Sequence, residues 1–374
     1  MSEKKLFEMI GTIKGANNQV IEMAKERQAF LAKPPGSLGY LEDISIKLAG
    51  ITGEVKNDVK KQCVAIMCAD NGVVDEGVAS APQSVTLCQT INFTRRLTGV
   101  SAMAKYYDID LLVVDIGVKM DIPKEICTDN MLENDKITRK IVNRRIANGT
   151  RNLAKEAAMT REEAVRGILT GIESAEAIKK SGCQLFGVGE MGIGNTTTTS
   201  AVLSALTGAK AIETVGRGGG LNDEGLEKKI KIVDDAVHSW CMNDPIEILA
   251  KVGGYDICAM VGAYLGAAIY RLPVVIDGFI SVVAACIAKE LNPLVTDFMF
   301  ASHKSYERGY VIAMDRLGIK PMFDLGMRLG EGSGCPIAFK IIETASAAMN
   351  LMATLEEGSI DGGYLEEIRE GNLF

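Results

Sequence analysis

Short apolar runs, each followed by a polar residue and then by a helical pattern, recur along this chain and constrain its fold most strongly. The clearest runs are residues 64–68, 111–114, 274–276 and 299–301, and the polar residues that follow them are Asp70, Asp115, Asp277 and Ser302. Continuous apolar runs are typical of parallel strands that are covered on both faces. Alternation with helices predicts an α/β fold with a doubly wound, mostly parallel sheet (Rossmann-like), in which right-handed crossovers bring the polar residues to one edge.

A glycine-rich stretch, residues 186–200, is the strongest candidate for a binding site. We expect a strand over residues 183–186, a helix over residues 201–206 and, between them, a turn that contains Gly192, Gly194, Asn195 and Thr196. Glycines let backbone N–H groups approach a ligand, and a helix start favours an anion, so a phosphate is the first hypothesis. A Thr-capped turn with nothing bound is the alternative. Glu190 is unfavourable beside a phosphate and is expected to face a cationic or reacting part of a ligand.

Other polar positions lie where ligands bind in open α/β sheets. Asp70 and Asn71 follow the first predicted strand, although a plain Asx-turn would explain them equally well. Glycine neighbours, including Gly330, leave the Glu331 carboxylate unobstructed for a ligand, unless they only cap a helix. The lysines of a predicted helix over residues 226–240 either solvate its face or supply the counter-charge for a phosphate.

Both ends of the chain are expected to be helical. Residues 4–31 carry apolar residues at helical spacing and predict one helix, and residues 41–51 predict another, which Gly53 closes. The last segment, residues 360–374, is expected to return to the N-terminal helix.

Composition excludes several classes of function. The net charge of -7, without a basic cluster, argues against nucleic acid and anionic membranes as partners. The most apolar region, residues 257–288, is interrupted by Arg271, Pro273 and Asp277 and predicts no membrane span. The first residues lack the apolar core of a signal peptide, so we expect a cytoplasmic protein. Nine cysteines without a CxxC pair and only two histidines argue against disulfides and a multi-histidine metal centre, which leaves carboxylates as the expected proton carriers.

Seven motifs occur in order along the chain. They are KPPGSLG at residues 33–39, CADNGV at 68–73, GVGEMG at 187–192, NTT at 195–197, VGGYD at 252–256, DGF at 277–279 and RLGEGSG at 328–334. Together they resemble the nicotinate-nucleotide:dimethylbenzimidazole phosphoribosyltransferase family over about residues 33–352. The resemblance implies transfer of ribose 5-phosphate from nicotinate mononucleotide to an aromatic base, with release of nicotinate, in assembly of the cobalamin lower ligand.

The same resemblance implies an organisation and a site. It implies no metal or other cofactor, a small helical domain from residues 1–58 and 353–374, a large α/β domain over residues 59–352, and a dimer with the active site near the interface. Glu331 is implied as the catalytic base and Glu190 as a second active-site glutamate. The expected phosphate or nucleotide contacts are Gly192, Gly194, Asn195, Thr196, Lys229, Ser305 and Gly330, and the expected acceptor-base residues are Ala81, Gln89, Asp70 and Asn71.

Three positions, Asn71, Ala81 and Tyr310, depart from residues common in the family and fall on the acceptor side. Some family members attach phenol or p-cresol through a C–O bond and work with a paralogous subunit, so a phenolic acceptor and a heterodimer are alternatives to a benzimidazole and a homodimer. A nicotinamide-dependent dehydrogenase is disfavoured because no GxGxxG turn follows the first strand. A non-catalytic nucleotide-binding partner subunit would not need both Glu190 and Glu331.

Overall fold

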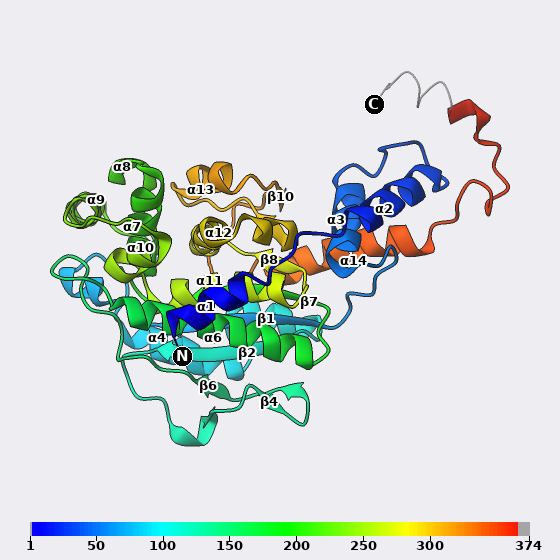
Figure 1. Ribbon diagram of the computed structural model, residues 1–374. Helices are drawn as coiled ribbons and strands as arrows, with labels where there is room; N and C mark the ends of the chain where they lie inside the picture. Colours follow the sequence, from blue (N-terminus) through cyan, green and yellow to red (C-terminus); the bar gives the residue numbers. More distant parts are fainter. Residues whose placement is uncertain (1, 366–374) are drawn as a thin grey trace.

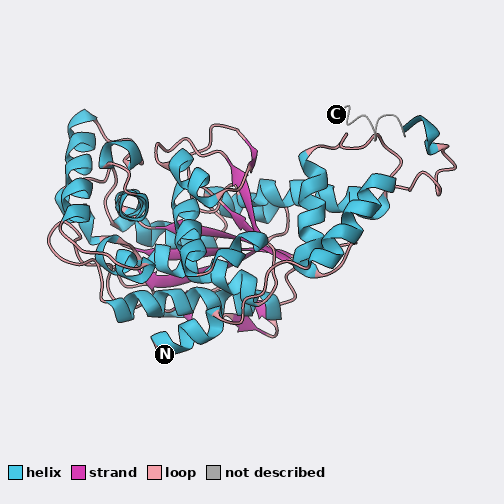
Figure 2. Cartoon of the chain, turned by 45° about the horizontal axis from the view of Figure 1, so that its top comes forward, coloured by secondary structure: helices cyan, strands magenta, loops and turns pink. Residues whose placement is uncertain are grey.

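A parallel sheet runs through the middle of the molecule, with helices on both of its faces (Figures 1 and 2). The computed structural model describes residues 2–365. In that range the strands of the sheet are β1 (Gln62–Ala69), β2 (Asp110–Gly117), β3 (Cys127–Thr128), β6 (Ile141–Asn143), β7 (Leu185–Met191), β8 (Val274–Ile276), β9 (Met299–His303) and β10 (Pro321–Phe323). Their order is β10-β9-β8-β7-β1-β2-β6-β3, and neighbouring strands run parallel. The predicted α/β fold with a doubly wound sheet is therefore confirmed.

The direction of winding reverses between β1 and β7. β1 pairs with β2 on one side and with β7 on the other, so that Cys68 of β1 lies opposite Met191 of β7. Ligands of open α/β sheets bind beyond the carboxyl ends of the strands at such a point. The residues that follow these two strands, Asp70 and Gly192, therefore lie at the place where a ligand site is expected.

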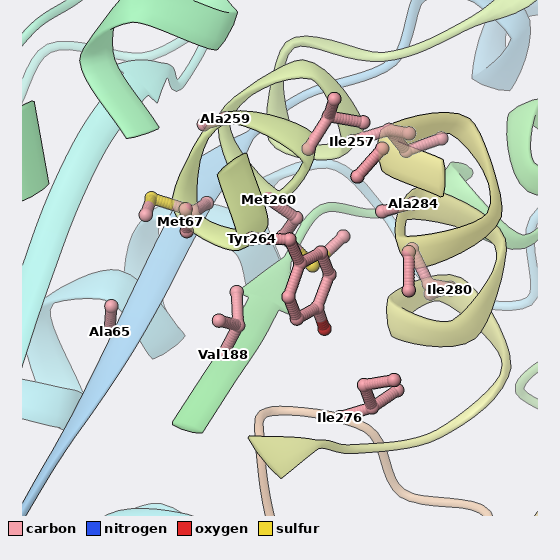
Figure 3. Close-up of a cluster of buried hydrophobic side chains, with 14 of the residues drawn as sticks. Ala65, Met67, Val188, Ile257, Ala259, Met260, Tyr264, Ile276, Ile280 and Ala284 are labelled. Carbon is pink, nitrogen blue, oxygen red and sulfur yellow. The ribbon is translucent and has the colours of Figure 1, made fainter. Parts of the chain in front are cut away.

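One face of the sheet is covered by α11 (Tyr255–Ile269) and α12 (Phe279–Leu291). Figure 3 shows the apolar cluster between them and the strands, with the labelled residues Ala65, Met67, Val188, Ile257, Ala259, Met260, Tyr264, Ile276, Ile280 and Ala284. α6 (Arg161–Lys180) packs on α11, which is why α11 has almost no polar residues: its side chains from Tyr255 to Ala268 are all buried.

The opposite face is covered by α4 (Ser84–Thr94), α5 (Gly99–Tyr106) and α14 (Cys335–Leu351). Successive residues of a strand point to opposite faces. Val188 accordingly lies in the cluster of Figure 3, whereas a Cβ added at Gly187 would lie 2.5 Å from Cys335 Sγ of α14. Each face of the sheet thus has its own helical layer.

The remaining elements connect these layers. The helices are α7 (Asn195–Thr207), α8 (Ala211–Thr214), α9 (Asp223–His238), α10 (Pro245–Val252) and α13 (Tyr310–Leu317), and the short 3-10 helices are η1 (Gly72–Glu76), η2 (Lys124–Ile126), η3 (Pro293–Phe298) and η4 (Gly362–Leu365). β4 (Leu132–Glu133) and β5 (Lys136–Ile137) form a separate antiparallel pair. Across residues 2–365, no helix combines the length and the apolar character that crossing a membrane requires.

The prediction of one helix over residues 4–31 is wrong. The segment forms α1 (Glu3–Ile10) and α2 (Asn18–Phe30). Asn17 caps α2 with its side chain, and its N–H donates to Gly50 O at 2.8 Å. The N–H of Ala16 donates to Asp297 Oδ2 at 2.9 Å. These bonds to residues distant in sequence hold the connecting segment in a non-helical conformation, which the apolar spacing could not indicate.

A lobe formed by α2, α3 (Tyr40–Thr52) and the adjoining part of α14 projects from the sheet (Figure 1). The segment after α14 returns along it, because Leu355 N–H donates to Phe30 O at 2.9 Å. α1 instead packs on α6, where Arg161 pairs with Glu3. The domain boundaries at residues 1–58, 59–352 and 353–374 stay a prediction, and of the predicted return of residues 360–374, residues 366–374 lie outside the described part.

Candidate active site

A cavity of about 350 Å³ opens at the carboxyl edge of the sheet, beside the reversal between β1 and β7. The predicted site residues that line it are Ala81, Gln89, Glu190, Gly192, Gly194, Asn195, Thr196, Lys229, Ser305, Gly330 and Glu331. Residues from widely separated segments of the chain therefore surround one space. Asp70 and Asn71 do not line it.

The glycine-rich stretch is not the turn that the sequence predicts. β7 continues to Met191, and α7 begins at Asn195, so the turn comprises only residues 192–194. Gly189 lies inside the strand, where an added Cβ would lie 2.4 Å from the carbonyl oxygen of Glu331. The glycine is thus needed because a loop from much later in the chain packs directly on the strand, which a local pattern cannot reveal.

That loop holds Glu331 in a strained conformation. Gly330, Glu331 and Gly332 have φ values of 83°, 63° and 84°, which is the left-handed region. For a residue other than glycine this conformation costs roughly 1–2 kcal/mol. Asp277 stabilises this loop conformation, because its Oδ2 accepts the N–H of Gly332 at 3.0 Å and its Oδ1 accepts the N–H of Gly334 at 2.7 Å. Burial raises the pKa of Asp277 to about 7.

The Glu331 carboxylate is held at the start of a helix. Its Oε2 accepts the N–H of Val100, the second residue of α5, at 3.2 Å, and Gln89 Nε2 donates to Oε1 at 3.5 Å. Burial raises the pKa of Glu331, and the hydrogen bonds from Val100 and Gly99 oppose that rise. A buried carboxylate with a raised pKa is a stronger base than an exposed one. Sequence reasoning missed this helix start, although the Thr98–Ser101 capping box marks it.

Glu190 lies next to Glu331 and is fixed at both of its oxygens. Oε1 accepts the backbone N–H of Glu331 at 3.2 Å, and Oε2 accepts a hydrogen bond from Asn195 Nδ2. Burial, followed by the charge of Asp256, raises the pKa of Glu190 to about 8. Two carboxyl groups with raised pKa values therefore adjoin the same cavity.

The side of the cavity at the amino end of α7 carries a buried cation. Lys229 of α9 is 1% exposed, and its Nζ donates to Thr196 Oγ1 at 2.8 Å and to Gly216 O at 3.2 Å. Burial lowers the pKa of Lys229 to about 8. Ser305, also buried, lines the same space. A helix start beside an ammonium group is a site suited to a phosphate.

Asp70 and Asn71 lie behind the turn that follows β7. Both are fully buried, and Asp70 Oδ2 accepts the N–H of Lys119 at 2.8 Å. A Cβ added at Gly192 would lie 3.1 Å from Asn71 Nδ2, so the turn covers this amide. The structure therefore places the two residues beneath the cavity floor and not at its surface.

Other lining residues were missed as site residues from the sequence. They are Arg217, His303, Glu307 and Arg328, among others. His303 is uncharged at neutral pH, since burial lowers its pKa to about 4. The ends of predicted strands and loops and, for Arg328, the RLGEGSG motif could have indicated them. Within residues 2–365, no three His, Cys, Asp or Glu side chains are grouped as ligands for a metal ion.

Known proteins resemble this chain over nearly its whole length. A family model described as phosphoribosyltransferase matches residues 13–360. A nicotinate-nucleotide–dimethylbenzimidazole phosphoribosyltransferase of Clostridium perfringens (strain ATCC 13124) is 54% identical over 371 residues, which cover 99% of each chain. A protein of the same name from Clostridium tetani is 45% identical, with 98% of each chain covered. A crystal structure of a protein of that name from Thermus thermophilus has a TM-score of 0.85 at 35% identity, covering 93% of this chain and 100% of that one.

Proposed function

Because this chain belongs to the nicotinate-nucleotide–dimethylbenzimidazole phosphoribosyltransferase family, we propose that it transfers the phosphoribosyl group of nicotinate mononucleotide to 5,6-dimethylbenzimidazole or a related aromatic base. The products are nicotinate and an α-riboside phosphate, a precursor of the cobamide lower ligand. The observation that carries this proposal is one cavity that holds the Glu190–Glu331 pair together with Lys229 at the amino end of α7.

The donor phosphate binds at the cationic side of the cavity. Lys229 supplies the positive charge and Thr196 a hydroxyl group, and Ser305 supplies a second hydroxyl from the loop after β9. Gly192, Gly194 and Asn195 present the turn and the helix start to the phosphate oxygens, where N–H groups and the helix dipole favour an anion.

Glu331 is the general base of the reaction. As one ring nitrogen of the acceptor attacks the anomeric carbon, the other loses its proton to the Glu331 carboxylate. The bond between ribose and nicotinate breaks, and its electron pair neutralises the pyridinium nitrogen of the leaving group. General-base help of this kind contributes about 10² to 10⁴ in rate. Attack opposite to the leaving nicotinate inverts the β-linkage of the donor to the α-linkage of the product.

Glu190 stabilises the positive charge that develops on the ribose as nicotinate leaves. It does so in its ionised form, and its position is set by the N–H of Glu331. Gly330 keeps the space beside this carboxylate open, since an added Cβ would lie 2.5 Å from Glu190 Oε1.

The acceptor base lies on the side of the cavity lined by α4 and the loop before it. Gln89 contacts both the cavity and Glu331, and Ala81 leaves room for a flat ring. Of the two other predicted acceptor residues, Asn71 acts from beneath, next to the turn at Gly192, whereas Asp70 holds the backbone N–H of Lys119.

The protein acts as a dimer in this proposal, with the cavity mouth near the interface. Leu329, which lines the cavity, is 59% exposed, and Tyr306, which lies between the lining residues Ser305 and Glu307, is 77% exposed. Apolar residues gathered at one place on a surface are typical of an interaction site. Sedimentation equilibrium should give twice the chain mass, and a mass that rises only when a paralogous subunit is added would favour a heterodimer.

The reaction is tested by incubating the purified chain with nicotinate mononucleotide and 5,6-dimethylbenzimidazole and following nicotinate release and product mass. Parallel samples contain phenol, p-cresol or no base. Release of nicotinate together with an α-riboside phosphate is the expected result, and the sample without base corrects for hydrolysis. Turnover with the phenols alone would change the acceptor class. Binding of the donor without nicotinate release in any sample would overturn the proposal.

A further inference from the structure

A buried chain of three side chains leads from the cavity into the protein. Asn195, at the start of α7, lines the cavity, and its Nδ2 donates to Glu190 Oε2. The same Nδ2 lies 3.3 Å from Oδ2 of Asp256, to which it also donates. An amide nitrogen has two hydrogens, so that Asn195 can serve both carboxyl groups at once. Asp256 is fully buried and does not line the cavity.

The position of Asp256 is fixed by its own surroundings. It is the second residue of α11, and its Oδ1 accepts the N–H of Ile257 at 2.9 Å. Two glycines leave room for its carboxyl group, one at the cap of the same helix and one in the turn after β7. A Cβ added at Gly254 would lie 2.3 Å from Oδ1, and one added at Gly192 would lie 3.1 Å from Oδ2. The space that the two glycines keep open therefore fits this carboxyl group closely.

We propose that Asp256 is a positioning residue, which holds Glu190 through the Asn195 amide and places a second carboxyl group beside it. This inference rests on the proposed function. Asn195 holds Oε2 of Glu190, and Oε1 then faces the N–H of Glu331. Asp256, Asn195 and Glu190 together fix the loop that contains Glu331 relative to β7.

The charges around Glu190 are mostly negative. Asp256 faces it from α11, Asp277 from the end of β8 and Glu331 from the neighbouring loop, while the Cys68 thiol lies on the adjacent β1. Burial raises the pKa of Asp256 to about 7 and that of Glu190 to about 8, so the pair retains a proton near neutral pH.

The cationic pyridinium of the donor would change this balance. A positive charge beside two carboxyl groups favours their ionised forms. Binding of nicotinate mononucleotide therefore releases a proton from the pair, and Glu190 becomes the anion that stabilises the ribose in the transition state. The retained proton removes one of the two negative charges that the pair would otherwise bury without a cationic partner before the donor arrives.

The first test is the pH dependence of kcat/KM for nicotinate mononucleotide in wild type and in Asp256→Asn. Removing the negative charge should move the acid limb of the profile to lower pH, by on the order of one pH unit. Asp297→Asn is the matched control, because this carboxyl group bonds to the Ala16 N–H far from the cavity, and it should leave the limb in place. An acid limb that does not move in folded Asp256→Asn overturns the inference.

The second test counts the protons released when nicotinate mononucleotide binds at a pH of about 7.5, from calorimetry in buffers of different ionisation enthalpy. Asp256→Asn should release fewer protons than wild type, by roughly half a proton per site. Contributions from Lys229 and from the phosphate are common to both proteins. Equal release by both proteins contradicts the inference.

If Asp256→Asn does not fold, the wild type still decides the matter. Its proton release should fall as pH rises from about 6.5 to about 9.5, after subtraction of the release seen with ribose 5-phosphate, which lacks the pyridinium. The inference fails if the two ligands release equal numbers of protons. Failure of the proposed function would look different, since wild type itself would then release no nicotinate with any base.

Discussion

The two sides of the cavity are built in opposite ways. The acidic wall, which comprises Glu190 and Glu331, is held by backbone N–H groups from α5 and from the loop that Asp277 anchors, together with the amides of Asn195 and Gln89. The cationic wall, which comprises Lys229 and the start of α7 at Thr196, depends on one long side chain held by two oxygens. Burial moves the pKa values of both walls toward neutrality, upward for the acids and downward for the lysine.

The acidic wall fixes the positions of its carboxyl groups, whereas the cationic wall mainly attracts a negatively charged group. Proton transfer and charge stabilisation depend on geometry at the scale of a hydrogen bond, and backbone donors fixed by the fold provide it. Holding a phosphate depends mainly on charge and tolerates small displacements. We therefore expect changes to the acidic wall to lower kcat and changes to the cationic wall to raise KM.

The sharpest test of the acidic wall is Glu331→Gln. The amide keeps the shape of the side chain but accepts no proton, so kcat should fall by about 10³ while the KM for nicotinate mononucleotide changes little. Steady-state nicotinate release measures both constants. Glu290→Gln, which removes a surface partner of Arg316, is the control and should retain wild-type kcat. If a folded Glu331→Gln protein kept the wild-type kcat, Glu331 would not be the general base of the reaction.

The cationic wall is tested by Lys229→Met. Loss of a charge-assisted contact to the phosphate, worth about 1.5–3 kcal/mol, should raise KM by roughly 10- to 100-fold with a smaller effect on kcat. In wild type, kcat/KM should fall as pH rises above about 8, because Lys229 then loses its charge.

Kinetics from about pH 7 to about pH 10 measure that alkaline limb, which should be absent in Lys229→Met. Lys231→Met changes an exposed lysine of the same helix and should behave as wild type. A decrease confined to kcat in Lys229→Met would contradict the division between the two walls.

Gly189→Ala tests whether the acidic wall depends on close packing of the backbone. The added Cβ would meet the carbonyl of Glu331, so the free energy of unfolding should fall by about 1–3 kcal/mol and kcat should fall with it. Gly208→Ala is the control, since its φ of 73° strains a side chain but nothing lies within 4 Å. It should lose stability yet keep kcat. Urea unfolding and nicotinate release on both variants distinguish these outcomes, and equal kcat values would argue against the packing explanation.

The last expected effect is on the pH dependence of stability and is measured without kcat or KM. The pKa of Glu190 rises from 4.5 in the unfolded chain to about 8 in the folded protein. Glu190 therefore makes its full contribution to the free energy of unfolding below its unfolded pKa of 4.5. That contribution is lost as the pH rises through about 8, where the buried carboxyl group of the folded protein ionises. Between about pH 5 and pH 8 the free energy of unfolding of wild type should fall more than that of Glu190→Gln, by on the order of 3 kcal/mol. Urea titrations across this range give both slopes, and parallel slopes would show that Glu190 does not retain its proton.

Local patterns predicted most of the strands and the ends of several helices. The run at residues 64–68 lies within β1, and Gly53 closes α3 with a φ of 82°, as expected. Such features depend on interactions among neighbours in sequence. The prediction that the whole glycine-rich stretch is a turn was wrong, because Gly189 makes room for Glu331. The residues near Gly189 in the sequence do not indicate this long-range contact.

The candidate site shows the same division. The motifs contain both glutamates and the family resemblance added Lys229, and the structure gathers all three around one cavity. The sequence also placed Asp70 and Asn71 at the acceptor, whereas they lie beneath the floor. A residue after a strand is near the edge of the sheet, but its depth depends on what packs over it.

The sequence by itself therefore determined the alternation of strands and helices, the class of sheet and the residues that carry charge. Burial of apolar runs and the caps of helices act over a few residues, so they can be recognised locally. Only the tertiary structure decided that β7 lies beside β1, that the loop at Glu331 packs on Gly189, and that Asp256 reaches Glu190 through Asn195. Those contacts join segments far apart in the chain, and the hydrogen bonds and pKa shifts that make the site exist only once they are formed.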